Sequence, residues 1–433
     1  MSGIKEALEG KNTTIRAWIH RKRSSGGVIF LILRDRDGLI QAVAHKENFS
    51  EEEWNELEKV RIESSVEIEG EVRKNEKALN SIEIEIKKFK IISNAEPYPI
   101  TEYQSTELLL DYRHLWLRSE RMINIMKIRS YVFKLAREYL DSQGFFEITP
   151  PIITKAGGET GSQLFEIKYF DEKAYLTESS QLYAEAMAFA LEKVYSFAPS
   201  FRAEKSRTVK HLAEYWHLEP EALFYDLNKL MELEENLVSY IANGLVKLAS
   251  KELEMLGVNK DYLLKINPPF KRITYEEALN IINQKRPEKQ LKWGDDFGVE
   301  EERLLTMEEE KPIFITYWPK EIKPFYMPIN EKDPRTVVCV DMQAPHGHGE
   351  IIGGSERIWK YDELIERFKE TEKSQGIKFN MENYSWYLDL RKFGSAPHAG
   401  FGMGIERLIK WLLNLENIRD AIPFPRTINR VKP

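Results

Sequence analysis

The chain has 433 residues, of which 42% are hydrophobic, and a formal net charge of −7, and this length is typical of two or three domains with a sizeable core. It contains no run of eighteen apolar residues, and its first residues resemble neither a signal peptide nor a transit peptide, so we expect a cytoplasmic protein that does not enter a membrane. Its one cysteine, Cys339, excludes an internal disulfide and a cysteine-based zinc cluster.

Residues 1–95 predict a small β-barrel. Three strands are expected between residues 13 and 43, separated by the turns SSGG and DRDG. A helical segment, ENFSEEEWNELEKV, precedes two alternating runs, SSVEIEGEVRK and SIEIEIKKFKII. Five short strands with one helix are typical of an OB-fold barrel, a common binder of single-stranded nucleic acid. Basic and acidic residues balance here, and a local basic cluster comprises Arg16, Arg21, Lys22, Arg23, Arg34 and Arg36.

The rest of the chain predicts an α+β domain. The proline-containing residues 96–118 are expected to form a hinge, and residues 119–433 one larger domain. Helices are predicted at IMKIRSYVFKLAREYLDSQGF, at residues 227–256 and at IERLIKWLLNL, whereas VVCVDM, GEIIGGSERI and WYLDLRKFG read as strands and loops. Residues from about 265 to 335 are mixed and charged, which is typical of an insertion.

Three separated stretches carry the residues of a nucleotide site. FRAEKSRTVKHLAEYWHLEPE and GFGMGIERL each place an arginine beside carboxylates, and GFFEITPPII contains paired prolines. Because the chain has no glycine-rich phosphate loop, arginine side chains must hold the phosphates. Arg202 and Arg407 suit that role, since a guanidinium stays charged and grips phosphate oxygens with two donors. We therefore predict that the chain binds ATP.

These stretches, in this order, resemble motifs 1, 2 and 3 of the class II aminoacyl-tRNA synthetases. LTESSQLYAEA and EIIGGSERI are similar to the aspartyl, asparaginyl and lysyl subgroup, and the likeness runs from Trp18 to Arg426. The resemblance implies an N-terminal OB-fold β-barrel that binds the anticodon, followed by a class II catalytic domain with an antiparallel sheet flanked by helices. It also implies a homodimer, formed near motif 1.

The resemblance assigns the phosphates of ATP to motifs 2 and 3. Arg202 matches the arginine that holds the α-phosphate, where it would neutralise charge as a carboxylate attacks phosphorus. Arg407 would hold the γ-phosphate, and Gly400, Gly402 and Gly404 before it would let the backbone approach the nucleotide.

Four more side chains fall where relatives contact ATP. Glu204 and Tyr215 match contacts to adenine, and Arg207 and His211 would reach the outer phosphates or the acceptor end of tRNA. From the residues alone, Tyr215 fits a core position nearly as well, and the two loop cations could simply be solvated.

Asp341 and Glu350 match the acids that hold Mg²⁺ against the triphosphate. Two acids suffice, because Mg²⁺ takes its other ligands from phosphates and water. His346 and His348 lie nearby and could suggest a zinc site. A structural zinc site needs four ligands at matched spacing, and no thiols accompany these imidazoles, so we predict that they are loop residues.

The amino-acid substrate follows from a second group of matches. Arg357 matches the arginine that grips the substrate side chain in aspartyl and asparaginyl enzymes, and Glu159 and Gln181 match residues that hold the α-amino group. Aspartyl enzymes carry a lysine where this chain has Ala184, and without that cation a substrate carboxylate stays underpaired. Glu219 can accept a hydrogen bond from a carboxamide and would repel a carboxylate. We therefore predict an asparagine–tRNA ligase of the archaeal-like type, acting on L-asparagine, ATP and tRNA(Asn).

Three barrel residues match anticodon contacts. Phe30 would stack on the central uridine, Gln41 would hydrogen-bond it, and Glu83 is a weaker match. From the sequence, Phe30 fits the barrel core equally well.

Three other functions stay open at this point. They are an aspartyl-tRNA synthetase, including one that does not discriminate between the two tRNAs, a non-catalytic RNA-binding relative, and an amide-forming amino-acid ligase. Joint retention of Arg202, Arg407, Asp341 and Glu350 argues against the second, and the complete barrel argues against the third.

Overall fold

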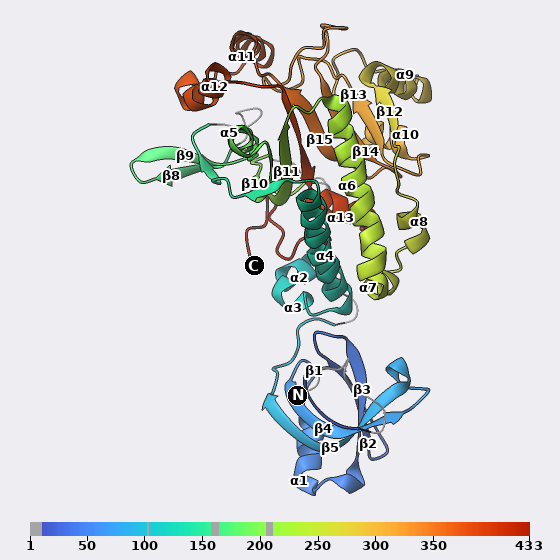
Figure 1. The fold of residues 1–433 in the computed structure, drawn as a ribbon. Coiled ribbons are helices and arrows are strands. Elements are labelled where there is room, and N and C mark those ends of the chain that lie inside the picture. Colours follow the sequence, from blue (N-terminus) through green and yellow to red (C-terminus); the bar gives the residue numbers. More distant parts are fainter. Residues whose placement is uncertain (1–10, 102–103, 157–163, 205–210) are drawn as a thin grey trace. The chain divides into compact units, whose positions relative to one another are not determined.

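The computed structural model describes residues 11–101, 104–156, 164–204 and 211–433, and the chain divides into two units, Met1–Leu109 and Leu110–Pro433 (Figure 1). The boundary between the units falls within residues 96–118, the segment predicted as a hinge.

The first unit is a closed barrel with the strand order β1-β2-β3-β5-β4 among its described residues. Its elements are β1 (Asn12–Ser25), β2 (Val28–Arg34), β3 (Leu39–His45), α1 (Glu51–Lys59), β4 (Ser65–Lys74) and β5 (Ile82–Ser93). Gly26 and Gly27 close the β1–β2 hairpin with φ of +57° and +80°, a region that glycine adopts without strain. Ile29, Leu31 and Leu33 alternate inward into the barrel core. The predicted OB-fold barrel is confirmed.

The second unit is built on a larger sheet covered by helices. Its helices, together with the one that crosses the boundary between the units, are α2 (Thr106–Asp111), α3 (Arg113–Trp116), α4 (Glu120–Ser142), α5 (Gln181–Leu191), α6 (Leu227–Leu248), α7 (Ser250–Met255), α8 (Lys260–Leu264), α9 (Tyr275–Lys285), α10 (Val299–Thr306), α11 (Tyr361–Gln375), α12 (Ser385–Lys392) and α13 (Ile405–Leu412). Its strands are β6 (Phe146–Ile148), β7 (Ile153–Thr154), β8 (Glu166–Tyr169), β9 (Glu172–Leu176), β10 (Lys193–Phe201), β11 (Glu214–Leu223), β12 (Lys271–Thr274), β13 (Ile313–Thr316), β14 (Cys339–Ala344), β15 (Gly349–Arg357) and β16 (His398–Gly404).

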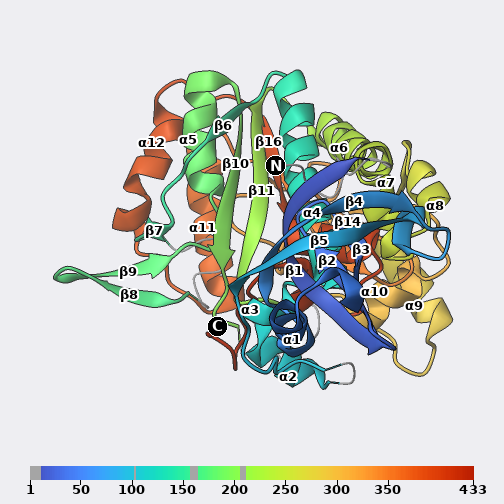
Figure 2. The ribbon, with the colours of Figure 1, turned by 90° about the horizontal axis from the view of Figure 1, so that it is seen from below.

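Within the described residues, eight strands form the large sheet in the order β12-β13-β14-β15-β16-β11-β10-β6. The predicted antiparallel sheet is correct for its centre, but the outer pairs β12–β13 and β10–β6 are parallel, so the sheet is mixed. The smaller sheet β7-β9-β8 includes the β8–β9 hairpin, which extends away from the large sheet (Figure 2).

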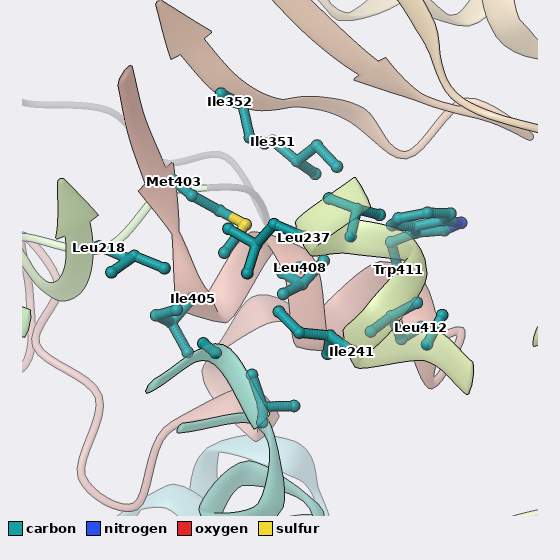
Figure 3. Packing of buried hydrophobic residues seen from close by; sticks show 14 of the residues in the cluster. Leu218, Leu237, Ile241, Ile351, Ile352, Met403, Ile405, Leu408, Trp411 and Leu412 are labelled. Carbon is teal, nitrogen blue, oxygen red and sulfur yellow. The ribbon is translucent and has the colours of Figure 1, made fainter. Parts of the chain in front are cut away.

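The large sheet has one apolar face and one polar face. On the apolar side, Leu218, Ile352 and Met403 lie on adjacent strands and pack against Leu237 of α6 and Leu408 of α13 (Figure 3). Successive strand residues point to opposite faces, so the neighbours of these residues face the other way.

The polar face is floored by glycine. One row across the strands joins Glu221, Gly400 and Ser355, and the next joins Gly402, Gly353 and Asp341. Small residues in the middle strands leave room above this face, and the candidate site lies there.

Three details differ from the sequence-based prediction. The helix expected over residues 227–256 breaks at Ala249, which leaves helical geometry at φ −128°, and both resulting helices, α6 and α7, contact α4. WYLDLRKFG was wrongly predicted as non-helical: all but its last two residues lie in α12, where Leu388 and Arg391 are buried at helical spacing. The expected insertion supplies β12 and β13 to the large sheet.

In the part of the chain that the structure describes, no helix combines the length and the apolar character needed to cross a bilayer.

Candidate functional site

A pocket of about 520 Å³ lies at the polar face of the sheet, between β11, β15, β16 and α13. The residues that line it include Arg202, His211, Tyr215, His217, Glu350, Gly402, Gly404, Glu406 and Arg407. An adjoining hollow shares Arg202, His211, Glu350 and Arg407 and adds Glu204. The structure therefore brings together the predicted ATP-binding side chains of motifs 2 and 3, except Arg207, which lies outside the described residues.

Arg407 is positioned by the residue before it. Glu406 is buried, and its carboxylate accepts a hydrogen bond from the backbone N–H of Trp216 (3.0 Å) and forms an ion pair with Arg129 (2.7 Å). With Glu406 fixed in the interior, Arg407 lines the pocket, where its Nη1 donates to the backbone oxygen of Glu350 (3.0 Å).

The two strands of motif 2 place an aromatic pair on the pocket wall. The ring of Tyr215 lies 5.4 Å from that of His217, and the guanidinium of Arg202 lies 5.7 Å from the Tyr215 centroid. Tyr215 is half-buried and lines the pocket, which favours its predicted position beside adenine.

Two glycines of β16 also accommodate neighbouring side chains, and Gly402 and Gly404 line the pocket. A Cβ atom at Gly402 would lie 2.4 Å from His217 Nε2, and one at Gly400 would lie 2.1 Å from the carboxylate carbon of Glu221. These two glycines make room for side chains of the neighbouring strand. At Gly404 a Cβ would meet Arg407 only at an ordinary 3.7 Å.

Asp341 and Glu350 converge although they lie on different strands. A register shift between Met342 and Gln343 lets both carboxylates approach the same point: Glu350 Oε1 would lie 3.2 Å and Asp341 Oδ1 3.6 Å from a Cβ on Gly353. Burial, together with the charge of Glu350, raises the pKa of Asp341 to about 7 even though Lys323 opposes the shift. Burial would also raise the pKa of Glu350, but the charges of Arg407, Lys323 and Arg202 outweigh it and lower that pKa.

This acidic pair fits Mg²⁺ presented with a nucleotide. Among the described residues, no group of three or more His, Cys, Asp or Glu side chains is arranged to hold a metal by itself. Two carboxylates beside a phosphate-sized pocket match the preference of Mg²⁺ for one or two protein acids plus phosphate oxygens.

Arg357 is buried and already has a carboxylate partner. Its Nη2 donates to Glu221 Oε1 (2.5 Å), its Nη1 donates to Ser355 Oγ (2.7 Å), and its guanidinium lies 5.1 Å from the ring of Tyr326. Burial raises the pKa of Glu221 to about 7, and the nearby charge of Glu185 acts in the same direction. The charge of Arg357 opposes this shift.

Glu219 lies two residues before Glu221, on the same face of β11. Its carboxylate accepts hydrogen bonds from the hydroxyls of Ser179 and Ser180 and from the backbone N–H of Ser180 (2.8 Å). Only 3% of Glu219 is exposed, and its partner Ser179 lines a smaller hollow.

Gln181 borders the same hollow as Ser179. Its Nε2 donates to Glu185 (3.0 Å), a buried carboxylate that also binds Arg391 and His398. Glu159, the other residue predicted at the α-amino group, lies outside the described residues. Ala184 is completely buried.

On the barrel, the three predicted anticodon residues lie on its outer side. Phe30 is half-buried on the outward face of β2 and does not belong to the barrel core cluster. Gln41 and Glu83 are paired across β3 and β5, and Gln41 Nε2 donates to Glu83 Oε2 (2.7 Å).

Two residues of the predicted basic cluster have partners within the barrel. Arg34 pairs with Glu63 (2.8 Å) in a largely buried setting, and Lys22 Nζ donates to the backbone oxygens of Glu58 and Val60.

Sequence reasoning missed Glu221, Glu406 and Lys323. The alternation of β11 could have identified Glu221, since it shares a face with Glu219. The Glu-Arg order of motif 3 could have identified Glu406. No pattern around Lys323 indicates that its ammonium meets Asp341.

Comparisons with known proteins identify the family of this chain. Residues 105–428 match the family described as class II tRNA synthetases (D, K and N), and residues 13–92 match the OB-fold nucleic acid binding domain. The asparagine–tRNA ligase of Thermococcus kodakarensis is 48% identical over 98% of this chain and 97% of its own length, and that of Thermoplasma acidophilum is 44% identical over 99% and 98%. The crystal structure of asparaginyl-tRNA synthetase from Pyrococcus horikoshii complexed with asparaginyl-adenylate superposes with a TM-score of 0.94 at 45% identity, covering 98% of this chain and 97% of that one.

Proposed function

We infer, because this chain belongs to the class II tRNA synthetases of the aspartate, lysine and asparagine group, that it is an ATP-dependent asparagine–tRNA ligase. The observation that carries the inference is the convergence of Arg202, Arg407 and Glu350 on one pocket, with Asp341 beside Glu350. Residues so far apart in the chain meet there because β10, β15 and β16 lie in one sheet.

The reaction needs orientation and charge neutralisation rather than a protein nucleophile. The carboxylate of asparagine attacks the α-phosphorus of ATP and pyrophosphate leaves, after which a ribose hydroxyl at the 3′ end of tRNA displaces AMP. Arg202 would neutralise charge that builds on the α-phosphate, and Arg407 would bind the γ-phosphate. Asp341 and Glu350 would hold Mg²⁺, which screens the charge of the phosphates when bound.

Asparagine fits the charge of the amino-acid pocket better than aspartate does. Arg357 is already neutralised by Glu221, and Glu219 adds a second buried carboxylate nearby. A substrate carboxylate would therefore meet two acids and one engaged guanidinium, whereas a carboxamide can accept from Arg357 and donate to an acid. Ala184 supplies no compensating cation.

The barrel would read the anticodon of tRNA(Asn). The half-buried Phe30 ring lies on the outward face of β2, where a base could stack on it, and the Gln41–Glu83 pair offers polar groups on the neighbouring strands. Sequence-tolerant stacking combined with a few hydrogen bonds is how OB-fold barrels bind single-stranded nucleic acid.

We also propose that two copies associate through the region of motif 1. β6 is the last strand of the large sheet, and the side chains of Phe146, Ile152 and Ile153 near it are 57%, 36% and 41% exposed. Apolar groups gathered at a sheet edge are typical of an interface. Light scattering that gives the mass of one chain in solution would contradict the dimer.

The function is tested by ATP–pyrophosphate exchange measured in parallel with asparagine and with aspartate. We expect asparagine to drive exchange at least about a hundredfold better, because the buried acids penalise a second carboxylate. Equal or better exchange with aspartate would make the chain an aspartyl-tRNA synthetase. No exchange with either amino acid would favour a non-catalytic RNA-binding protein.

A further inference from the structure

Lys323 lies against the acidic pair and has no role in the proposed reaction so far. It belongs to the connection between β13 and β14, and its Nζ lies 2.7 Å from Asp341 Oδ2. Only 17% of the Lys323 side chain and 9% of the Asp341 side chain are exposed, so this ion pair is largely shielded from water.

The lysine is held in place by more than its charge. Its ammonium lies 4.4 Å from the centroid of the buried Trp318 ring, a distance at which a cation is attracted to the ring face. The ring keeps the ammonium beside Asp341. The carboxylate of Asp341 in turn converges with that of Glu350 above Gly353.

We propose that Lys323 is a resident cation of the acidic pair: its ammonium neutralises Asp341 at rest and must leave that carboxylate when a divalent cation binds. The inference rests on the proposed function, in which Asp341 and Glu350 hold Mg²⁺. A cation bonded to Oδ2 repels a metal that seeks the same carboxylate, so Lys323 weakens metal binding to the free enzyme.

Nucleotide binding would reverse this balance. The triphosphate brings several negative charges into the pocket lined by Arg202, Arg407 and Glu350, next to the carboxylate of Asp341 that Lys323 pairs with. The added negative charge favours a divalent cation over the ammonium. Lys323 therefore couples metal binding to ATP binding, and the enzyme binds metal mainly together with its substrate.

The test is a Mn²⁺ titration of the full-length protein, followed by the electron paramagnetic resonance of free Mn²⁺, with and without a non-hydrolysable ATP analogue. The variants are Lys323→Met and Lys323→Gln, which remove the charge, and Lys323→Arg, which keeps it. Lys320→Met is the matched control, because Lys320 lies in the same connection but pairs at 3.7 Å with Glu370.

We expect Lys323→Met and Lys323→Gln to bind Mn²⁺ about tenfold more tightly than the wild type without nucleotide, and the gain from adding the analogue to shrink. Lys323→Arg and Lys320→Met should behave as the wild type. Unchanged or weaker Mn²⁺ binding by both neutral variants would overturn the inference.

Asp341→Asn separates this inference from the proposed function. If it leaves Mn²⁺ binding unchanged, the proposed metal site itself is wrong; if it weakens binding while the neutral Lys323 variants do not strengthen it, only the role of Lys323 is wrong. Should the neutral variants fail to fold, the proposal is tested on the wild-type protein instead. In its crystal structure with Mn²⁺ and the analogue, Nζ should lie beyond about 4 Å from Asp341, and a retained ion pair with metal bound would refute the proposal.

Discussion

Arg357 combines two tasks that a single substitution can separate. Its guanidinium forms a buried ion pair with Glu221 and is also the proposed contact to the substrate side chain. Removing one partner of a buried pair leaves the other charge uncompensated, which costs about 3–5 kcal/mol. Arg357→Ala would therefore damage folding as well as catalysis.

Arg357→Lys is the sharper test, because it keeps a cation beside Glu221 and removes the two-pronged donor. We expect kcat/KM for asparagine in pyrophosphate exchange to fall about 100-fold, with a much smaller change in the melting temperature. Arg335→Lys is the control, since Arg335 is exposed and pairs with Asp333 at 2.7 Å. Exchange by Arg357→Lys at the wild-type rate would remove Arg357 from the substrate site.

At the scale of residues, the sequence predicts those whose chemistry is visible in a motif. Arg202 and Arg407 were predicted to share a site because phosphate binding without a glycine-rich loop demands guanidinium groups, and both line one pocket. Lys323 could not be predicted, because its contact with Asp341 depends on how the β13–β14 connection folds back over Trp318. Phe30 stayed ambiguous in the sequence because a strand pattern alone does not reveal which of its two faces is the inner one.

The pairing of α6 with the large sheet buries a carboxyl group. Glu234 is completely buried, and neither of its carboxyl oxygens has a hydrogen-bond partner among the described residues. A Cβ on Gly354 would lie 2.7 Å from Glu234 Oε1, so the Glu234 side chain fits here because residue 354 is a glycine. Burial raises the pKa of Glu234 well above its ordinary value, and the charges of Asp341 and Glu235 raise it further.

This shift predicts a stability that falls as the pH rises. The native state keeps the Glu234 proton above the unfolded-state pKa of about 4.3, so each further pH unit favours the unfolded chain by up to about 1.4 kcal/mol until Glu234 ionises. Glu234→Gln removes that penalty, and calorimetry should find its melting temperature rising relative to the wild type between pH 5 and pH 8. Glu232→Gln, an exposed change in the same helix, should show no such trend. A constant difference across that range would contradict the assignment.

At the scale of elements, the sequence predicts helices and strands that have a strong apolar periodicity. It does not predict local irregularities of the backbone. The strands of the barrel and the helices α4 and α13 follow clear apolar periods. The break at Ala249 and the register shift between Met342 and Gln343 leave no mark in composition, yet the shift brings Glu350 beside Asp341. Tertiary packing decides such features.

The two units have separate hydrophobic cores and separate proposed tasks. The barrel core is formed by residues of β1 to β5 and α1, whereas the ATP and amino-acid pockets are lined by residues of the second unit. In the proposed function, amino-acid activation uses only the second unit, and tRNA charging uses both. A change on the outer face of the barrel should therefore affect one step and spare the other.

Phe30→Ala tests this separation. Stacking of a base on an aromatic ring contributes about 1–3 kcal/mol, so loss of the ring should raise KM for tRNA(Asn) about 10- to 100-fold while asparagine-dependent pyrophosphate exchange stays at the wild-type rate. Phe49→Ala is the control, because the Phe49 ring packs against the barrel core and its loss loosens the barrel without removing the proposed stacking surface. If Phe49→Ala impairs charging as much as Phe30→Ala, barrel stability rather than base stacking explains the effect. Equal loss of exchange and charging in Phe30→Ala would refute the division of labour between the units.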